Sequence, residues 1–242
     1  MLVTLAVWGG EAVHAGAVTS AAERSAARAA ATRSAPAAKS AAERAALQAL
    51  WRQLDQKTLN SITKRYGQYI EPRRLEQALK SDATIMGRDA FDAYLKKVAP
   101  KLSEAERKEI LGVYLDHKVT LDGQQVDVPL TVAHERLHQL ANPRFRQALG
   151  DKLDEGVTEL MARQIYRDLS LADAPKVYPD NVKIANMLRA RVGEERLARA
   201  YLEGDIGPLR HIVDADLGRG RFDQFARAGR EGNLDLAMQL LR

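Results

Sequence analysis

The sequence of 242 residues contains no cysteine, so it can form neither a disulfide nor a thiolate metal site. Any zinc-type site must therefore use histidine and carboxylate side chains. Aromatic residues are also scarce, at 5%, although hydrophobic residues make up 45% of the chain. A packed core is possible, but leucine, alanine, valine and isoleucine must fill most of it.

Long hydrophobic runs are absent as well. No stretch approaches the roughly 18 apolar residues of a membrane-spanning helix, so no membrane span is expected. The apolar start, residues 1–10, lacks the basic residues of a secretory signal, although residues 14–17, His-Ala-Gly-Ala, are similar to a signal-peptidase site. We expect a soluble protein, which is either cytoplasmic or exported by a non-classical route.

The chain has an excess of positive charge, with a formal net charge of +5 and a pI of about 9.4. This balance can indicate a nucleic-acid or anionic partner. However, the basic residues are spread along the chain among acidic ones, and no basic stripe with interleaved aromatics is present. We therefore expect no nucleic-acid partner, and keep a basic nucleic-acid-binding protein as an alternative.

Composition divides the chain into three parts. Residues 1–44 are rich in alanine with serine, arginine and glutamate, and have too few large apolar groups to bury a face, so they predict a flexible linker or tail. Residues 45–117 predict a helical subdomain, and residues 118–242 a second domain. Within the subdomain, helical periodicity covers residues 45–54, 59–70, 72–80, 88–98 and a segment from Ser103 to Leu115.

The pattern changes after residue 117. Residues 118–121 and 124–128 predict the two strands of a short hairpin, with a tight turn at Asp122-Gly123. Helical periodicity then returns. The predicted helices cover residues 131–142, 151–168, 179–191, 194–202 and 221–241. The predicted fold class is α+β and mostly α, with a short β-hairpin or sheet preceding the helix that begins at residue 131.

The chemistry of the chain is concentrated in residues 134–138, His-Glu-Arg-Leu-His, inside a predicted helix. Residues four apart lie on one face of a helix, so His134 and His138 can reach one metal ion. Glu135 follows the first histidine and can lie beside the metal without binding it, within reach of a bound water. The alternative is an ordinary helix with a solvated His-Glu pair.

An acidic helix follows this motif. Glu155 lies 17 residues after His138 (155 − 138), and Glu159 lies four residues later on the same helical face. The interval leaves room for a turn and a second helix that packs back against the first. Such a helix can bring a third ligand to the metal, although both carboxylates could instead be solvated surface.

Here the chain resembles the gluzincin metallopeptidases, the thermolysin-like class, over about residues 119–168. The resemblance implies Zn²⁺ as cofactor, Glu155 as the third ligand, and Glu159 as acceptor of the His134 N–H. The reverse assignment of the two glutamates stays open. The chain departs from the thermolysin-like pattern at Asp154, where asparagine is common. It is closer to compact bacterial gluzincin-like domains, some of which are exported effectors or toxins.

The resemblance also implies a side chain that stabilises the oxyanion and a strand edge that pairs with the substrate backbone. Tyr178 and His211 are the candidates for the first role, and residues 124–130 for the second. For Tyr178 and His211 a surface or core role is the stronger alternative, and for residues 124–130 a hairpin that only packs on the core is an equal alternative. His14 is assigned to the tail and His117 to a helix end or loop.

The predicted function is hydrolysis of a peptide or protein substrate, with Glu135 activating a zinc-bound water. One alternative is a non-catalytic helical binding or structural protein with a vestigial motif. Another is a protease restricted to self-processing or to a single target. The sequence does not determine the substrate, the native metal or the oligomeric state.

Overall fold

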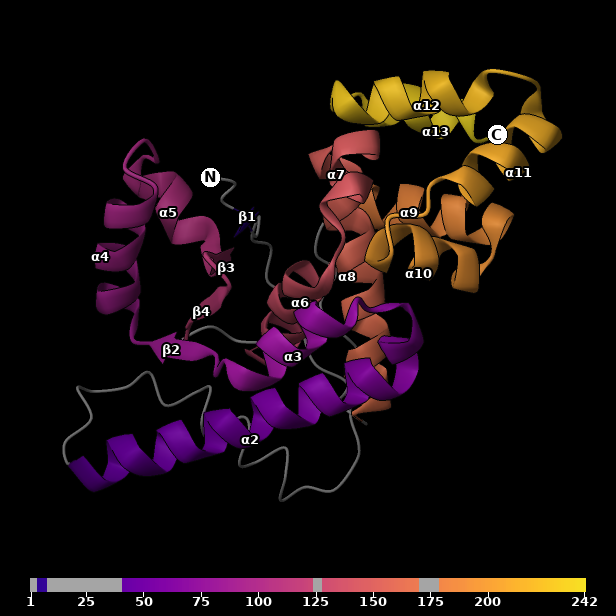
Figure 1. The fold of residues 1–242 in the computed structure, drawn as a ribbon. Helices are drawn as coiled ribbons and strands as arrows, with labels where there is room; N and C mark the ends of the chain where they lie inside the picture. The colour runs from indigo at the N-terminus through magenta and orange to yellow at the C-terminus, as the bar shows by residue number, and fades with distance from the viewer. Residues whose placement is uncertain (1–3, 8–40, 124–127, 170–178) are drawn as a thin grey trace. The chain divides into compact units, whose positions relative to one another are not determined.

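A computed structural model describes residues 4–7, 41–123, 128–169 and 179–242, and these residues confirm the mostly helical α+β fold class (Figure 1). They form two compact units, each built from several segments. The first unit takes residues 1–64, 76–139 and 162–175, and the second takes residues 65–75, 140–161 and 176–242. This division differs from the predicted one, whose boundary after residue 117 falls inside a hairpin. Most of the predicted tail lies outside the described residues.

The first unit is built on a four-stranded sheet in the order β1-β3-β4-β2. The strands are β1 (Thr4–Val7), β2 (Thr84–Met86), β3 (Ile110–Leu115) and β4 (Lys118–Asp122). Strand β3 pairs antiparallel with both of its neighbours, and β2 pairs parallel with β4. The helices of this unit include α2 (Ala41–Tyr66), α4 (Arg88–Val98), α5 (Glu104–Glu109) and α6 (Val128–Leu140).

Both faces of the sheet are covered by apolar side chains. One cluster joins Trp51 of α2 and Val132 of α6 to Leu121 of β4. The other joins Phe91 of α4 to Val113 of β3. Because β3 is buried from both sides, its sequence is an apolar run without the alternation of a half-exposed strand.

The predicted hairpin was misplaced. The observed hairpin joins β3 to β4 through Asp116 and His117, which both have positive φ, 49° and 63°, as a tight two-residue turn requires. The predicted turn residues Asp122 and Gly123 instead end β4 beside β2. The apolar run 110–115 is a strand and not the end of a helix, since periodicity alone does not separate a doubly buried strand from a buried helix.

The second unit is helical in its described part. Its elements are η1 (Gly67–Tyr69), α3 (Pro72–Lys80, in part), α7 (Pro143–Leu149), α8 (Asp151–Asp168, in part), α9 (Pro179–Val192), α10 (Glu194–Leu202), α11 (Gly207–Leu217), α12 (Arg221–Arg230) and α13 (Leu234–Leu240). The predicted boundaries of α3, α4, α8 and α10 are confirmed. The predicted helix 221–241 is two helices, because Gly232, with φ of 70°, breaks it. Within the described residues, no helix has the length and apolar character that crossing a bilayer requires.

Candidate metal site

Helix α6 carries the two histidines of the motif, and all of its residues from 131 to 140 are buried. His134 is fully buried and His138 is 6% exposed. Their Nε2 atoms face each other at 3.0 Å, and their ring centroids are 4.7 Å apart. Two nitrogens bound to one tetrahedral zinc at about 2.0–2.1 Å each would lie about 3.3 Å apart. The spacing of the two rings therefore fits a shared metal ion with little adjustment.

The third member of the site is Glu155, which lies in the first turns of α8 and is partly buried. Its neighbour Gly156 permits a close approach of α9, because a Cβ at this position would lie 2.2 Å from the carbonyl oxygen of Asn181. No side chain larger than hydrogen fits there without moving one of the two helices. Glycine at position 156 therefore sets how closely α9 packs beside the Glu155 turn.

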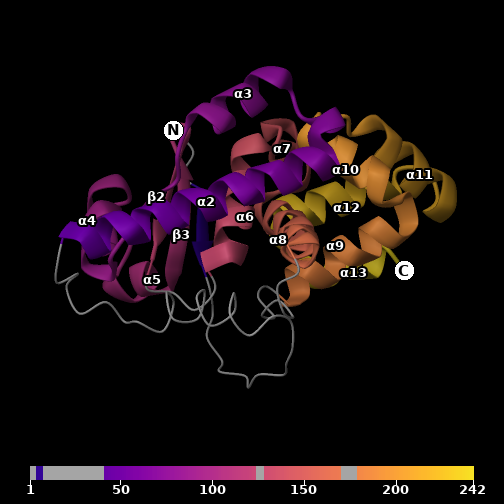
Figure 2. The same cartoon turned by 90° about the horizontal axis from the view of Figure 1, so that it is seen from below.

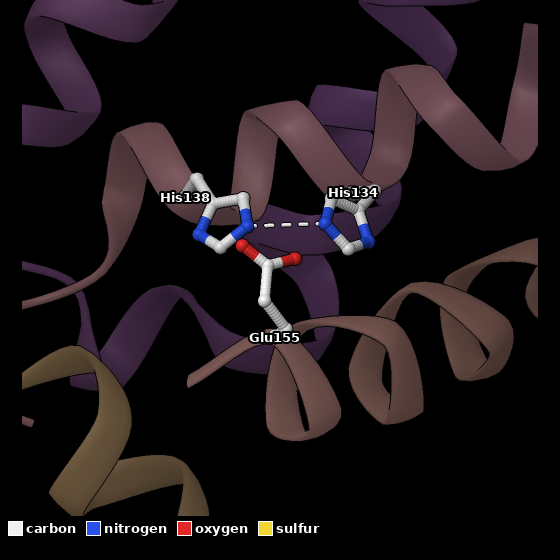
Figure 3. A group of neighbouring side chains, drawn as sticks. All are labelled: His134, His138 and Glu155. Atoms are coloured by element: carbon white, nitrogen blue, oxygen red, sulfur yellow. Dashed lines mark hydrogen bonds between the residues drawn. The ribbon is translucent and has the colours of Figure 1, made fainter. Parts of the chain in front are cut away.

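His134, His138 and Glu155 form a group whose ligand atoms all lie within 4.8 Å of one another (Figure 3). The Glu155 carboxylate points toward the two imidazole nitrogens that face each other. Two imidazoles and a carboxylate form the ligand set of many catalytic zinc sites, and they suit first-row transition metals in general. These three side chains could hold a metal ion, and the group contains Glu155 and not Glu159.

Glu135 is fully buried on α6, between the two histidines in sequence. Its side chain lies against β3: a Cβ placed on Gly112 would be 2.8 Å from Cγ and 2.9 Å from Oε1 of Glu135. Gly112 thus leaves the space that the Glu135 side chain fills. The sequence contained no signal for this pairing, because it depends on the sheet lying beside α6.

Arg136, also within the motif, is fully buried and holds α6 to α2. Its Nε donates to Asp55 Oδ1 at 2.7 Å, and its Nη2 donates to the other oxygen of the same carboxylate. Further Arg136 hydrogen bonds reach the Ser81 hydroxyl and the Gln139 side chain. A guanidinium whose donors are satisfied in this way fixes the helix that carries both histidines. Sequence reasoning missed this residue, since arginine in a helix is ordinarily solvated.

A second polar contact holds α8 within the second unit. The Thr158 hydroxyl donates to the Asp154 carbonyl at 2.7 Å, so it accepts a hydrogen bond from the Tyr201 hydroxyl of α10. Thr158 and Tyr201 are both fully buried. Tyr201 therefore fixes the turn of α8 that follows Glu155. The sequence offered no signal that singled Tyr201 out from the other tyrosines.

The remaining predicted residues are taken in turn. Glu159 is fully buried on α8, and its hydrogen bond to His134 stays a prediction. His211 is exposed on α11 and is not a member of the group. Tyr178 lies outside the described residues, as does His14. His117 is the exposed second residue of the β3–β4 turn, where its Nδ1 contacts the Tyr114 hydroxyl at 3.2 Å.

The predicted substrate-pairing segment, residues 124–130, is not a strand where it is described. Residues 124–127 lie outside the described part, and Val128, Pro129 and Leu130 form the first turn of α6. The strand that lies beside Glu135 is β3. When the chain is compared with protein-family models, curated proteins and solved structures, none of them matches it.

Proposed function

We propose that this chain is a zinc-dependent metallopeptidase of the gluzincin type, with His134, His138 and Glu155 as its metal ligands. The observation that carries the proposal is the convergence of these three side chains from α6 and α8. Glu135, on the same helix as the histidines, provides a carboxylate that is not in the ligand group. Two histidines, a carboxylate ligand and a separate carboxylate are the parts that zinc-assisted hydrolysis requires.

In the proposed mechanism, zinc supplies Lewis-acid chemistry when bound, which lowers the pKa of a coordinated water toward about 7. Glu135 accepts a proton from the attacking water and then passes it to the leaving amine of the substrate. The contact with Gly112 restricts where the Glu135 carboxylate can lie. Arg136, through Asp55, keeps α6 in place during this exchange.

Site-directed variants can separate zinc binding from peptide hydrolysis. We expect Glu135→Gln to keep one zinc per chain and to lose hydrolysis by a factor of about 100 or more, because the amide cannot accept the proton. His134→Ala should lose both hydrolysis and zinc, because it removes a metal ligand. Zinc is measured by mass spectrometry of the purified protein, and hydrolysis by mass spectrometry of a mixed peptide library, which does not presuppose the substrate.

Glu76→Gln is the matched control, because Glu76 is exposed and forms an ion pair with Lys80 one turn later on α3. This variant should keep both zinc and activity. A Glu135→Gln protein that cleaves the library as fast as the wild type would refute the role of Glu135. A wild-type protein that binds no zinc would refute the metal site and favour the non-catalytic alternative.

A further inference from the structure

Strand β1 occupies the outer edge of the sheet in the first unit. The sheet order is β1-β3-β4-β2, so β3 would be an edge strand without it. Strand β1, in indigo, lies beside β3 (Figure 2). The two strands run antiparallel, with Thr4 opposite Tyr114, Leu5 opposite Val113 and Ala6 opposite Gly112. Thus a segment of only four residues covers the hydrogen-bonding edge of β3.

The covered strand is the one that contacts Glu135. Gly112, which lies opposite Ala6, is the β3 residue whose Cβ position is 2.8 Å from the Glu135 side chain. The β1–β3 pairing therefore covers the part of β3 that lies beside Glu135, the proposed general base. An extended peptide that is to be attacked near Glu135 would find this edge the nearest one in the sheet.

Extended peptides commonly bind proteins by adding a strand to an exposed sheet edge, where backbone hydrogen bonds supply affinity for many sequences. An edge can accept only one such strand. Residues 4–7 therefore exclude any peptide that would pair with β3 on the same side. Because β1 belongs to the same chain, this competition does not depend on protein concentration.

The pairing is short and ends irregularly. The register shifts between Ala6 and Val7, so that Ala6 lies opposite Gly112 and Val7 lies opposite Ile110. A short pairing with a bulge contributes few backbone hydrogen bonds, and such elements open at low free-energy cost.

We infer that strand β1 is an autoinhibitory strand, which occupies the edge of β3 where a peptide substrate pairs and must leave before the substrate binds. The inference rests on the proposed peptidase function and names a regulation of that site. It places the substrate backbone on β3, in contrast to the predicted segment 124–130.

The test uses the full chain with Ala6→Pro. Proline removes one backbone donor and fixes φ, so it opposes strand pairing at the residue opposite Gly112. Ala17→Pro, outside the pairing, is the matched control. Three quantities are measured on each protein: zinc content, hydrogen exchange of the amides of Gly112 and Tyr114, which lie opposite Ala6 and Thr4, and cleavage of the mixed peptide library. We expect Ala6→Pro to keep its zinc, to exchange these amides faster, and to cleave at least tenfold faster than the wild type.

A synthetic peptide with the sequence of residues 1–10 then tests the edge directly. Added to Ala6→Pro, it should slow cleavage and restore the protection of the measured β3 amides against hydrogen exchange. Equal cleavage by an active, zinc-loaded wild type and Ala6→Pro would overturn the inference and leave the proposed function standing. If Ala6→Pro and a second variant, Val7→Pro, both fail to fold, β1 is a structural strand and the inference falls. Zinc-loaded proteins that all fail to cleave would refute the peptidase function and the inference with it.

Discussion

The two compact units hold their helices by different means. In the first, a buried ion pair between Arg136 and Asp55 joins α6 to α2, and its side chains are 0% and 6% exposed. In the second, helices approach through glycine: a Cβ at Gly156 would meet Asn181, and a Cβ at Gly150 would meet the Gly229 carbonyl at 2.4 Å. Ion pairs in this second unit, such as Arg210 with Asp223, lie at half-exposed side chains.

This difference predicts different consequences of substitution. A buried charge that loses its partner keeps its full desolvation cost, whereas a glycine that gains a methyl group forces two helices apart. The loss of a buried charge's partner lowers the free energy of unfolding mainly through electrostatics. The methyl group added at a glycine shifts the side chains that the two helices carry, and on α8 one of these side chains is Glu155.

The largest effect is expected from Asp55→Ala, which leaves the Arg136 guanidinium buried without its carboxylate. We expect the free energy of unfolding to fall by about 3–5 kcal/mol, as measured by urea denaturation. The double variant Asp55→Leu with Arg136→Met should recover most of this loss. Glu194→Ala, which removes a partly exposed pair with Arg65, should cost less than about 1 kcal/mol. A loss that small for Asp55→Ala would contradict the assigned importance of the ion pair.

The next effect is expected from Gly156→Ala in the second unit. Alanine favours a helix by about 1 kcal/mol over glycine, but its Cβ would overlap the Asn181 backbone. We expect a net loss of about 1–3 kcal/mol in stability and a weaker zinc affinity, because the Glu155 turn must shift. Zinc titration with a competing chelator measures the affinity. Gly207→Ala is the control, since its nearest neighbour would be 3.6 Å away, and unchanged zinc affinity in Gly156→Ala would contradict the prediction.

Gly112→Ala in the first unit should act on turnover and not on metal binding. Its Cβ would lie 2.8 Å from Cγ of the buried Glu135 side chain and 2.8 Å from Cδ2 of Leu121, so both side chains would have to move. A small misplacement of a catalytic group costs about 10-fold to 100-fold in rate. We expect a loss in kcat of this size with zinc content unchanged. Loss of zinc in step with activity would show that Gly112 supports the whole of α6 and not Glu135 alone.

The smallest effect concerns acid stability in the first unit. Hydrogen bonds from the Lys96 and Arg107 side chains lower the pKa of Asp92 from 3.8 to about 2. The folded state therefore favours the ionised carboxylate. This contribution to stability is complete above pH 4 and is lost as the pH falls toward 2. Asp92→Asn should reduce the fall in Tm between pH 4 and pH 2. The control Asp235→Asn, at an exposed position on α13, should leave this fall unchanged. Identical profiles of Tm against pH for Asp92→Asn and the wild type would contradict the prediction.

Sequence reasoning succeeded where the signal was local. The helical segment predicted from Ser103 does start there, with a capping box in which the Glu106 N–H donates to the Ser103 hydroxyl at 3.2 Å. Helix α8 begins directly after Gly150, and α10 lies between Gly193 and Gly204. The hairpin prediction was wrong because it placed the tight turn at Asp122-Gly123, whereas the turn forms a few residues earlier, at Asp116-His117. Which one forms depends on β2 pairing with β4, and that contact is remote in sequence.

The sequence by itself determined the pair His134 and His138, since a four-residue spacing on a helix places two side chains on one face whatever surrounds them. The helical period also placed Glu155 and Glu159 on one face of α8, and the resemblance to the gluzincins favoured Glu155 as the ligand. Only the tertiary structure decided that Glu155 joins the group, that Gly112 borders Glu135, and that Arg136 is paired inside the protein. It also decided that residues 4–7 cover β3. These contacts join residues far apart in the chain, and packing, which no local periodicity encodes, brings them together.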